Sequence, residues 1–464
     1  MAQPEQLDVL VIGSGEAGKW ITWELASAGR RTAVVERRWI GGSCPNINCL
    51  PSKNEIYSAK VADVVRHADV FGTEVTGART NMAKVVARKR KMVEGEIAIH
   101  RQRYRETGSE LILGEARFVA PKTVEVALND GGTRLLHGEQ VFLSLGTRPS
   151  IPPLPGLAEV AMTNIEMLEL DRVPQHLVVL GGGYVGLEFA QAYRRFGSRV
   201  TVTERGARLL RSEDPEVSEA ISRLLADEGV EVLLGAEPVR VDGDRGDLRL
   251  VVRTADGERT IEASDVLAAL GRTPNTGGIG LEVAGVALDG RGYIAVNERL
   301  ETSAPGVWAV GECAGSPQFT HVAFDDFRVV RDNLAGRSRS TRGRLIPFCL
   351  FTDPPLARVG LNELEARTRG VAVRVAMLPM QNVLRTETTD ETRGFMKVLV
   401  GAEGAQRDQI LGFTMFGAEA GEVMAVVQTA ILGGLPYTAL RDAIYAHPTM
   451  AEGLNALFAR VPDR

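Results

Sequence analysis

The feature that most constrains this chain is a pattern of strand, glycine turn, helix and strand that occurs twice. Its first copy opens with the apolar segment "DVLVIGSGEAG", which runs into Gly13, Gly15 and Gly18. A helical stretch over residues 19–28 follows, and the strand "TAVVE" then ends on Glu36. In such a βαβ unit the glycines let the backbone approach a pyrophosphate at the helix N-terminus, and the terminal acid bonds ribose hydroxyls. The segment therefore predicts a dinucleotide site.

A second copy lies far along the chain, in "HLVVLGGGYVGLEFAQAYRRFGSRVTVTE". It contains Gly181, Gly183 and Gly186 and ends on Glu204. Two such units predict an α/β protein with two Rossmann-like domains, each of which binds its own dinucleotide. Glycine turns without a ligand are the alternative for either unit, and two empty units are less expected than one.

Two connectors divide the chain. The segment "VFLSLGTRPSIPPLPG" indicates a strand that ends at Gly146 and passes into a proline-rich linker, and "LGRTPNTGG" closes the second unit. From about Leu345 onward, strands and helices alternate to the end. The length of the chain suggests about three domains, which agrees with these divisions.

Charge and composition bear on what the chain binds. The formal charge of −5 offers no broad attraction to nucleic acid or to an anionic membrane. The run Arg88, Lys89, Arg90 and Lys91 lies in a long helical stretch and is interpreted as a solvated helix face. The start "MAQPEQLDVLVIGSG" lacks the pattern of a signal peptide, and no segment approaches the ~20 apolar residues of a membrane span. We expect a cytoplasmic protein that acts on small molecules.

The segment "IGGSCPNINCLPSKN" carries Cys44 and Cys49. A zinc site would need a second pair of ligands at short spacing, which the scattered histidines do not supply, and a structural disulfide is not expected in a reducing compartment. On a regular helix, residues five apart rise ~7.5 Å and point ~140° apart, so a bond between these thiols requires a distorted helix start. Pro45 and Asn48 suit such a distortion. These points favour a redox pair, for which the two dinucleotides would supply electrons.

The same segment, taken with both βαβ units and the late "HPTMAE", resembles the flavoprotein disulfide reductases, which include dihydrolipoamide dehydrogenase, glutathione reductase and mercuric reductase. The resemblance covers the whole chain. It implies FAD on the first unit, a nicotinamide cofactor on the second, and a C-terminal α+β domain that forms a homodimer. The implied division is an FAD-binding part at residues 1–148, an NAD(P)-binding domain at 149–272, a returning FAD-binding or central part at 273–343, and an interface domain at 344–464.

The resemblance also assigns roles by position within the thiol segment. It implies that Cys49 lies next to the flavin and that Cys44 is the thiol that exchanges with substrate. Lys53 falls where the family places a lysine beside the reactive flavin nitrogen, and Glu188 resembles the ion-pair partner of that lysine. Without the motif, Lys53 and Glu188 would be read as ordinary helix residues.

Further roles follow from the C-terminal segment and the cofactor motifs. His447 and Glu452 are implied as an acid–base catalyst and its orienting carboxylate, both contributed to the site of the partner subunit, because thiol exchange needs a group that titrates near neutrality. Glu312 stands where the family usually has aspartate. No resident metal is expected. The expected cofactor contacts are Gly13, Gly15, Gly18, Glu36, Gly42, Ser43, Lys53, Ala116, Gly146, Gly181, Gly183, Gly186, Glu204, Gly271, Gly311 and Glu312.

Departures from individual family members bear on the substrate. Mercuric reductases carry a vicinal cysteine pair near the C-terminus and a tyrosine in place of His447, whereas this chain ends "FARVPDR" with neither, which disfavours mercury reduction. Trp20 and Trp23 stand where glutathione reductases hold their charged substrate, so glutathione is disfavoured. These tryptophans share a helix face and are either core packing or an aromatic wall for an apolar disulfide.

The sequence thus predicts an enzyme that passes electrons from NAD(P)H through FAD and the cysteine pair to a small disulfide, or that runs in reverse as a dithiol dehydrogenase. Glu204 favours NADH because it would repel a 2′-phosphate, and NADPH is the alternative because Arg205 and Arg208 follow. A mercuric- or other metal-ion reductase, or an electron donor to a protein partner, is the alternative if the thiols are vestigial. Asn48, where the family commonly has glycine, leaves that alternative open.

Overall fold

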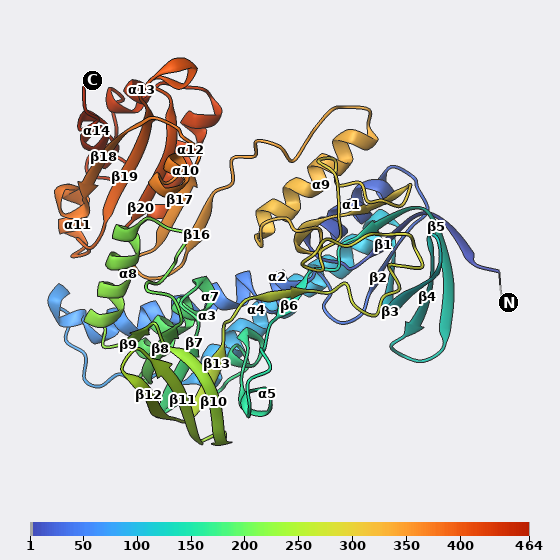
Figure 1. Ribbon diagram of the computed structural model, residues 1–464, viewed down its shortest axis with the longest axis horizontal. Helices are drawn as coiled ribbons and strands as arrows, with labels where there is room; N and C mark the ends of the chain where they lie inside the picture. The colour runs from blue at the N-terminus through green and yellow to red at the C-terminus, as the bar shows by residue number, and fades with distance from the viewer. Residues whose placement is uncertain (1–2, 464) are drawn as a thin grey trace.

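The computed structural model describes residues 3–463, and its N-terminal part is built on a largely parallel sheet (Figure 1). β1 (Glu5–Ile12) lies between β2 (Thr32–Glu36) and β5 (Thr133–Leu143), and both neighbours run parallel to it. β3 (Glu110–Ala120) extends the sheet beyond β2, while β4 (Thr123–Leu128) pairs antiparallel with β3 and β5. Val9, Leu10 and Val11 are fully buried, as expected for a parallel strand covered on both faces.

The helix α1 (Glu16–Ser27) connects β1 to β2 and begins before the predicted residue 19. The glycine motif itself forms the first turn, because Gly15 is the N-cap and Gly18 lies inside the helix. A Cβ on Gly18 would lie 2.2 Å from the carbonyl oxygen of Gly13, so only glycine lets α1 pack this closely on the turn. α9 (Thr320–Leu334) lies against α1 (Figure 1).

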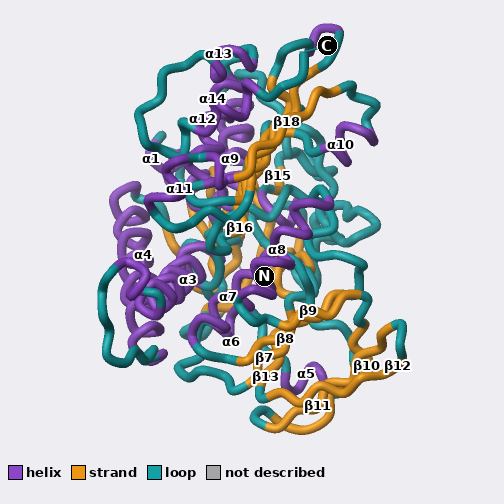
Figure 2. Tube along the Cα trace, turned by 90° about the vertical axis from the view of Figure 1, so that its left-hand side faces the viewer, coloured by secondary structure: helices purple, strands orange, loops and turns teal. Residues whose placement is uncertain are grey.

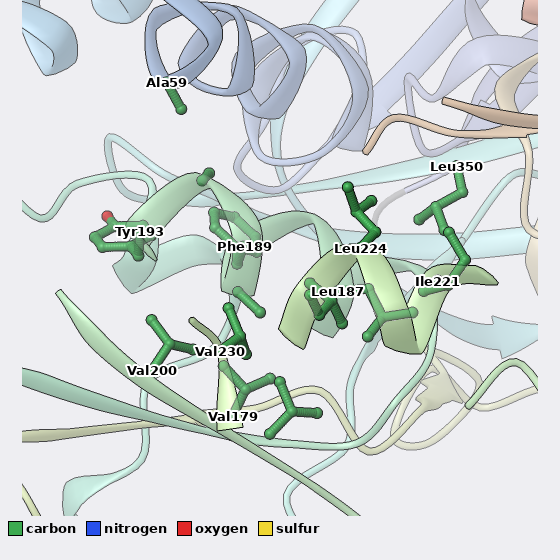
Figure 3. Packing of buried hydrophobic residues seen from close by; sticks show 14 of the residues in the cluster. Ala59, Val179, Leu187, Phe189, Tyr193, Val200, Ile221, Leu224, Val230 and Leu350 are labelled. Carbon is green, nitrogen blue, oxygen red and sulfur yellow. The ribbon is translucent and has the colours of Figure 1, made fainter. Parts of the chain in front are cut away.

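A second parallel sheet forms around the second glycine motif. Its order is β13 (Asp265–Ala268), β7 (His176–Leu180), β8 (Arg199–Glu204) and β9 (Glu231–Leu234). α7 (Tyr184–Phe196) follows β7, α8 (Pro215–Asp227) precedes β9, and an antiparallel sheet consists of β10 (Glu237–Asp244), β11 (Asp247–Thr254) and β12 (Gly257–Ala263). Figure 3 shows the core of this region, where Phe189 and Tyr193 of α7 lie between Val179 and Val200 on one side and Ala59 of α3 (Cys49–Arg66) on the other. The helix that carries Cys49 is therefore packed on the second nucleotide-binding unit.

The chain crosses between the two sheets at a ribbon of β6 (Thr147–Pro149) and β14 (Arg272–Pro274). Short helices α5 (Leu157–Val160) and α6 (Asn164–Met167) precede β7. After β14, β15 (Val307–Ala309) pairs in parallel with β5, and η2 (Gly311–Ala314) and α9 follow. The segment after β14 therefore completes the first sheet.

The C-terminal domain is an antiparallel sheet flanked by helices (Figure 1). Its strand order is β16 (Phe348–Leu350), β17 (Leu356–Gly360), β20 (Ile410–Phe416), β19 (Phe395–Gly401) and β18 (Val373–Pro379). Its helices are α10 (Glu363–Thr368), α11 (Leu384–Thr388), α12 (Ala420–Leu432), α13 (Tyr437–Arg441) and α14 (Gly453–Ala459), with short turns η3 (Met380–Asn382) and η4 (Gly404–Gln406). The predicted fold class, with two Rossmann-like units and a C-terminal α+β domain, is confirmed.

The helix α4 (Met82–Thr107) carries the basic run and lies beside α3 (Figure 2), with η1 (Ala68–Phe71) between them in sequence. The prediction of a solvated face is wrong for Lys89, which is 1% exposed. Its Nζ donates to the carbonyl oxygen of Leu168 at 2.6 Å and pairs with Glu169. This lysine ties α4 to the segment that leads into β7.

Within residues 3–463, none of the helices combines the length and the apolar character that a bilayer crossing requires.

Candidate active site

Cys44 and Cys49 lie on either side of a break between α2 (Ser43–Asn46) and α3. Cys44 has φ −105° and ψ 108° inside α2, and Asn48, the N-cap of α3, has φ −130° and ψ −101°, so neither residue is helical. The two thiols do not follow one regular helix, and each shifts the pKa of the other. The distorted helix start that the spacing requires is present.

The two thiols differ electrostatically. The neighbouring Cys49 thiol, together with burial, raises the pKa of Cys44 far above its ordinary value. The neighbouring Cys44 thiol lowers the pKa of Cys49 to about 6, assisted by the hydroxyl of Thr320 and the ammonium group of Lys53 against the opposing effects of burial and Glu188. The Thr320 hydroxyl lies 3.0 Å from the Cys49 sulfur. The negative charge of the reduced pair is therefore favoured on Cys49 over Cys44.

Lys53 and Glu188 are brought together beside the thiols. The Lys53 Nζ lies 2.5 Å from Oε2 of Glu188, whose side chain is 7% exposed. The other carboxylate oxygen accepts from the backbone N–H of Phe351 at 2.9 Å, and the ammonium group lies 4.8 Å from the Phe351 ring centroid. The pair joins α3 and α7 to Phe351, the residue that follows β16 in the C-terminal domain.

A cavity of ≈ 480 Å³ is lined by residues of the first glycine motif and by Cys44. A Cβ on Gly13, which has φ +94°, would lie 2.2 Å from the Ser144 carbonyl oxygen, and a Cβ on Gly42, which has φ +76°, would lie 2.5 Å from Cα of Gly15. The cradle therefore depends on glycine, and it fits a flavin dinucleotide at the N-terminus of α1. The predicted contacts that line it are Gly13, Gly15, Glu36, Gly42, Ser43, Ala116, Gly146, Gly311 and Glu312. Gly18 and Lys53 lie outside this lining.

The carboxylate of Glu36, at the end of β2, is already engaged within the chain. One oxygen accepts from the backbone N–H and the hydroxyl of Ser14 at 2.9 and 2.7 Å, and the other accepts from the N–H groups of Arg38 and Trp39 at 2.8 and 3.0 Å. These four bonds use the acceptor capacity of a carboxylate. A ribose hydroxyl must displace one of them, and the Ser14 hydroxyl has the Trp39 carbonyl oxygen, 3.3 Å away, as a second acceptor.

Glu312 lies at the junction between the two nucleotide-binding units. Its carboxylate accepts from the hydroxyl of Thr147 in β6 and lies 3.5 Å from Nε of Arg272 in β14. The longer side chain, where the family usually has aspartate, is therefore anchored to the ribbon that links the two sheets.

A second cavity of ≈ 440 Å³ lies at the second glycine motif, and its lining includes Gly181, Gly183 and Glu204. The Glu204 carboxylate accepts from the N–H groups of Gly182 at 3.0 Å and Gly206 at 2.7 Å. Unlike Glu36, it accepts two such bonds within residues 3–463, so it keeps acceptor capacity for a ribose diol.

Other residues predicted for the second site are placed differently. A Cβ on Gly186 would lie 2.2 Å from the Gly181 carbonyl oxygen, so Gly186 serves helix packing, and Gly271 lies outside the lining. Arg205 lines the cavity, whereas the Arg208 guanidinium donates to the carbonyl oxygen of Arg211 at 3.1 Å. Arg211 itself lines the cavity, and the sequence interpretation missed it because it lies beyond the motif.

His447 and Glu452 form a pair on the loop between α13 and α14. Nδ1 of His447 lies 2.9 Å from a carboxylate oxygen of Glu452, and the histidine side chain is 60% exposed. The pair is preassembled, and its imidazole is open on the surface of the C-terminal domain.

The two tryptophans of α1 separate into two environments. Trp23 is 6% exposed and packs on His100 and Tyr104, as a core residue does. Trp20 is half-buried, packs on Phe324, and donates from Nε1 to Glu16 at 2.9 Å. Core packing is therefore correct for Trp23.

Two residues of the site escaped the sequence interpretation. Thr320 bonds the Cys49 sulfur from the start of α9, and Asn164 bonds the segment between the thiols from α6. A threonine next to an apolar helical run is a weak local signal for a helix start, and nothing local connects Asn164 to the cysteines.

Two family sequence models match this chain, one in its N-terminal part and one in its C-terminal domain. The sequence model of the family described as pyridine nucleotide-disulphide oxidoreductase matches residues 7–326. The model described as the dimerisation domain of the same group matches residues 346–457.

Individual relatives extend this likeness over the full chain. The chain is 33% identical over 462 residues to a probable pyridine nucleotide-disulfide oxidoreductase, RclA, of Escherichia coli, covering 97% of this chain and 98% of that protein. It is 33% identical over 454 residues to a mercuric reductase of Staphylococcus aureus, covering 97% of this chain and 81% of that protein. Among solved structures, the Cu(II) complex of the HOCl-induced flavoprotein disulfide reductase RclA from Escherichia coli matches with a TM-score of 0.89 and 32% identity, covering 99% of this chain and 100% of the other.

Proposed function

The chain belongs to the pyridine nucleotide-disulphide oxidoreductase family, and on that premise we propose that Cys44 and Cys49 are its working redox pair. The protein is an NAD(P)H-dependent flavoprotein disulfide oxidoreductase that uses FAD. Its dimerisation domain supports a homodimer. The observation that carries the assignment of the pair is its placement: Cys44 lines the cavity of the first glycine motif, and the Cys49 sulfur lies 3.0 Å from the Thr320 hydroxyl, where its pKa is lowered.

FAD would be held along the first cavity by the glycine cradle around Gly13, Gly15 and Gly42. When bound, it accepts a hydride from NAD(P)H and supplies two electrons to the disulfide. Cys49 is the proposed thiol on the flavin side, because its thiolate is stabilised by Thr320 and Lys53. Glu188 holds the Lys53 ammonium in place at 2.5 Å.

Cys44 is the proposed nucleophile toward substrate. Its thiolate attacks one sulfur of a disulfide, forms a mixed disulfide, and releases the other half of the substrate as a thiolate. Cys49 then attacks the Cys44 sulfur, which releases the second thiolate and closes the protein disulfide. The overall step moves two electrons from the protein dithiol to the substrate.

The proton on Cys44 requires a base, because the neighbouring Cys49 thiol and burial hold its pKa high. We assign this role to His447 of the partner subunit, with Glu452 fixing the ring through Nδ1 at 2.9 Å. The same imidazole then returns the proton to the leaving thiolate. The 60% exposure of the His447 side chain in one chain supports a role completed by a second copy.

NADH is the proposed electron donor. Glu204 lines the second cavity with spare acceptor capacity for a ribose diol and would repel a 2′-phosphate, although Arg205 and Arg211 line the same cavity. The cytoplasmic location stays a prediction.

A metal-ion reductase is the second candidate, because a dithiol is a soft ligand set and mercuric reductases are among the relatives. The other cysteines are Cys313, which is buried, and Cys349, and the two do not form a vicinal pair.

The test compares acceptors in one assay of NADH oxidation: lipoamide, glutathione disulfide, an aromatic disulfide, Cu(II) and Hg(II). Turnover of an uncharged disulfide that exceeds turnover of both metal ions supports the proposal. Fast metal-ion turnover with no disulfide turnover would contradict it.

A further inference from the structure

An asparagine from the second nucleotide-binding unit holds the turn between the two thiols. Asn164 is the first residue of α6 and is 6% exposed. Its Nδ2 donates to the carbonyl oxygen of Ile47 at 2.6 Å and to Oδ1 of Asn48 at 2.8 Å. Both acceptors lie in the short segment between Cys44 and Cys49, so the Asn164 side chain holds this turn by two hydrogen bonds.

The partners of Asn164 fix the orientation of its amide. A backbone carbonyl only accepts, so the group that faces Ile47 must be the NH₂ end. The second hydrogen of that group meets the acceptor end of the Asn48 side chain. Asn48 stands where the family commonly has glycine, and glycine would offer no such acceptor. The contact therefore depends on a departure of this sequence from the family pattern.

Asn164 is itself anchored to the second sheet. Thr163 caps α6 together with Glu166, whose carboxylate accepts from the Thr163 N–H and hydroxyl at 2.7 and 2.6 Å. One residue earlier, Met162 makes two backbone hydrogen bonds of 2.8 Å to β13. β13 pairs with β7, the strand that leads into the second glycine motif. A short, bonded path thus joins the nucleotide-binding sheet to the thiol turn.

The other side of the turn is anchored to the first unit. Nδ2 of Asn46 donates to the carbonyl oxygens of Ile40 and Gly42 at 2.9 and 2.7 Å. Ile47 is 8% exposed, and it lines the first cavity. Without Asn164, the Ile47 carbonyl oxygen would lose its bond in a buried setting, and the turn would be held from one side only.

We propose that Asn164 is a positioning residue for the redox pair: by clamping the turn to the second nucleotide-binding unit, it keeps the Cys44 and Cys49 sulfur atoms in reach of each other and favours closure of their disulfide. This role deepens the proposed function and rests on Cys44 and Cys49 being the working pair. Asn48 is the second half of the clamp.

The test is the disulfide equilibrium of the purified holoenzyme in mixtures of reduced and oxidised dithiothreitol. Protein dithiol and oxidised dithiothreitol exchange to give protein disulfide and reduced dithiothreitol, with two electrons and two protons moving together. Thiols are trapped by alkylation, and the peptide that holds both cysteines is weighed by mass spectrometry. For Asn164→Ala we expect the equilibrium constant for disulfide formation to fall about tenfold, because a turn released on one side lets the two sulfur atoms separate in the dithiol and lowers their effective concentration toward each other. That change corresponds to a potential ~30 mV more positive.

Two further variants make the result specific. Asn48→Gly removes one acceptor of the clamp and should shift the equilibrium in the same direction by less. Asn333→Ala is the matched control, because Nδ2 of Asn333 also donates to two backbone carbonyl oxygens, those of Val329 and Arg339, at 2.8 and 2.7 Å. It lies about 20 Å along α9 from the Thr320 end, and it should leave the equilibrium unchanged.

An equilibrium shift no larger for Asn164→Ala than for Asn333→Ala would overturn the inference. If Asn164→Ala does not fold, the Asn48→Gly variant decides alone, and an unchanged equilibrium there overturns the clamp. The proposed function fails separately if NADH does not reduce the cysteine pair in the unmodified holoenzyme.

Discussion

The thiol turn and the His447–Glu452 loop differ in how much of their surroundings one chain supplies. At the turn, the Cys49 sulfur lies 3.0 Å from the Thr320 hydroxyl, and Asn164 holds the intervening backbone at 2.6 Å. At the loop, the imidazole has a carboxylate 2.9 Å from Nδ1, and the side chain is 60% exposed. One region is enclosed by several elements of the same chain, and the other is an open surface pair.

This difference matches the two kinds of transfer that the chemistry needs. The proposed electron transfer through the thiols depends on fixed distances and on a partly buried thiolate, which one chain can build by packing α3, α7 and α9 around the turn. Proton transfer needs access to both Cys44 and the substrate, so an exposed imidazole suits it. Under the proposed function, one chain supplies the electron path and a second copy supplies the base for Cys44.

Removing the proposed nucleophile, Cys44, should have the largest effect on disulfide turnover. For Cys44→Ser we expect disulfide turnover to fall by a thousandfold or more, roughly the scale of losing an essential nucleophile. Reduction of the flavin by NADH should persist, because it does not need Cys44. Stopped-flow absorbance and steady-state assays measure the two steps, and disulfide turnover near the wild-type rate in this variant would contradict the mechanism.

Removing the His447 imidazole tests the exposed loop, which carries the proposed acid–base group. His447→Ala should lower disulfide turnover about 10²- to 10³-fold, the usual contribution of general acid–base catalysis. The disulfide equilibrium of the cysteine pair should stay near that of the wild type, since the loop does not hold the turn. Unaltered turnover across the pH range would mean that the proton on Cys44 leaves by another route.

The charged groups around Cys49 affect the pKa of its thiol. Its pKa lies at about 6, and Lys53 lowers this value while Glu188 raises it. Lys53→Met should therefore move the pH midpoint of the thiolate upward, and Glu188→Gln should move it downward, each by roughly one pH unit. The thiolate–flavin absorbance of the reduced enzyme reports the midpoint. Shifts of the same sign in both variants would show that packing, not charge, governs this thiol.

A mixed dimer gives the smallest but most specific effect. In a heterodimer of a Cys44→Ser chain and a His447→Ala chain, partner-supplied histidine leaves one site with both groups intact. We expect such heterodimers, separated by different affinity tags, to regain about half the wild-type turnover, since one of two equivalent sites works. Each homodimer is its own control. A heterodimer as inactive as both homodimers would place the cysteine and histidine of one site in the same chain.

A feature could be predicted from the sequence where it depends on residues that lie close together along the chain. The strands, the glycine turns and the cysteine spacing are local patterns, so the fold class and the thiol turn could be predicted. The burial of Lys89 could not, because its acceptors at Leu168 and Glu169 come from a distant segment. Thr320 and Asn164 escaped for the same reason, since each reaches the cysteines only through the packing of separate elements.

The most direct test of the central claim is an anaerobic titration of the purified, FAD-containing protein with NADH, followed by visible absorbance. We expect a long-wavelength thiolate-to-flavin band after addition of two electrons, because the pair is then reduced and the lowered pKa of Cys49 favours its thiolate. Bleaching of the flavin from the first addition, without that band, would show that the thiols are outside the electron path and would contradict the proposed function.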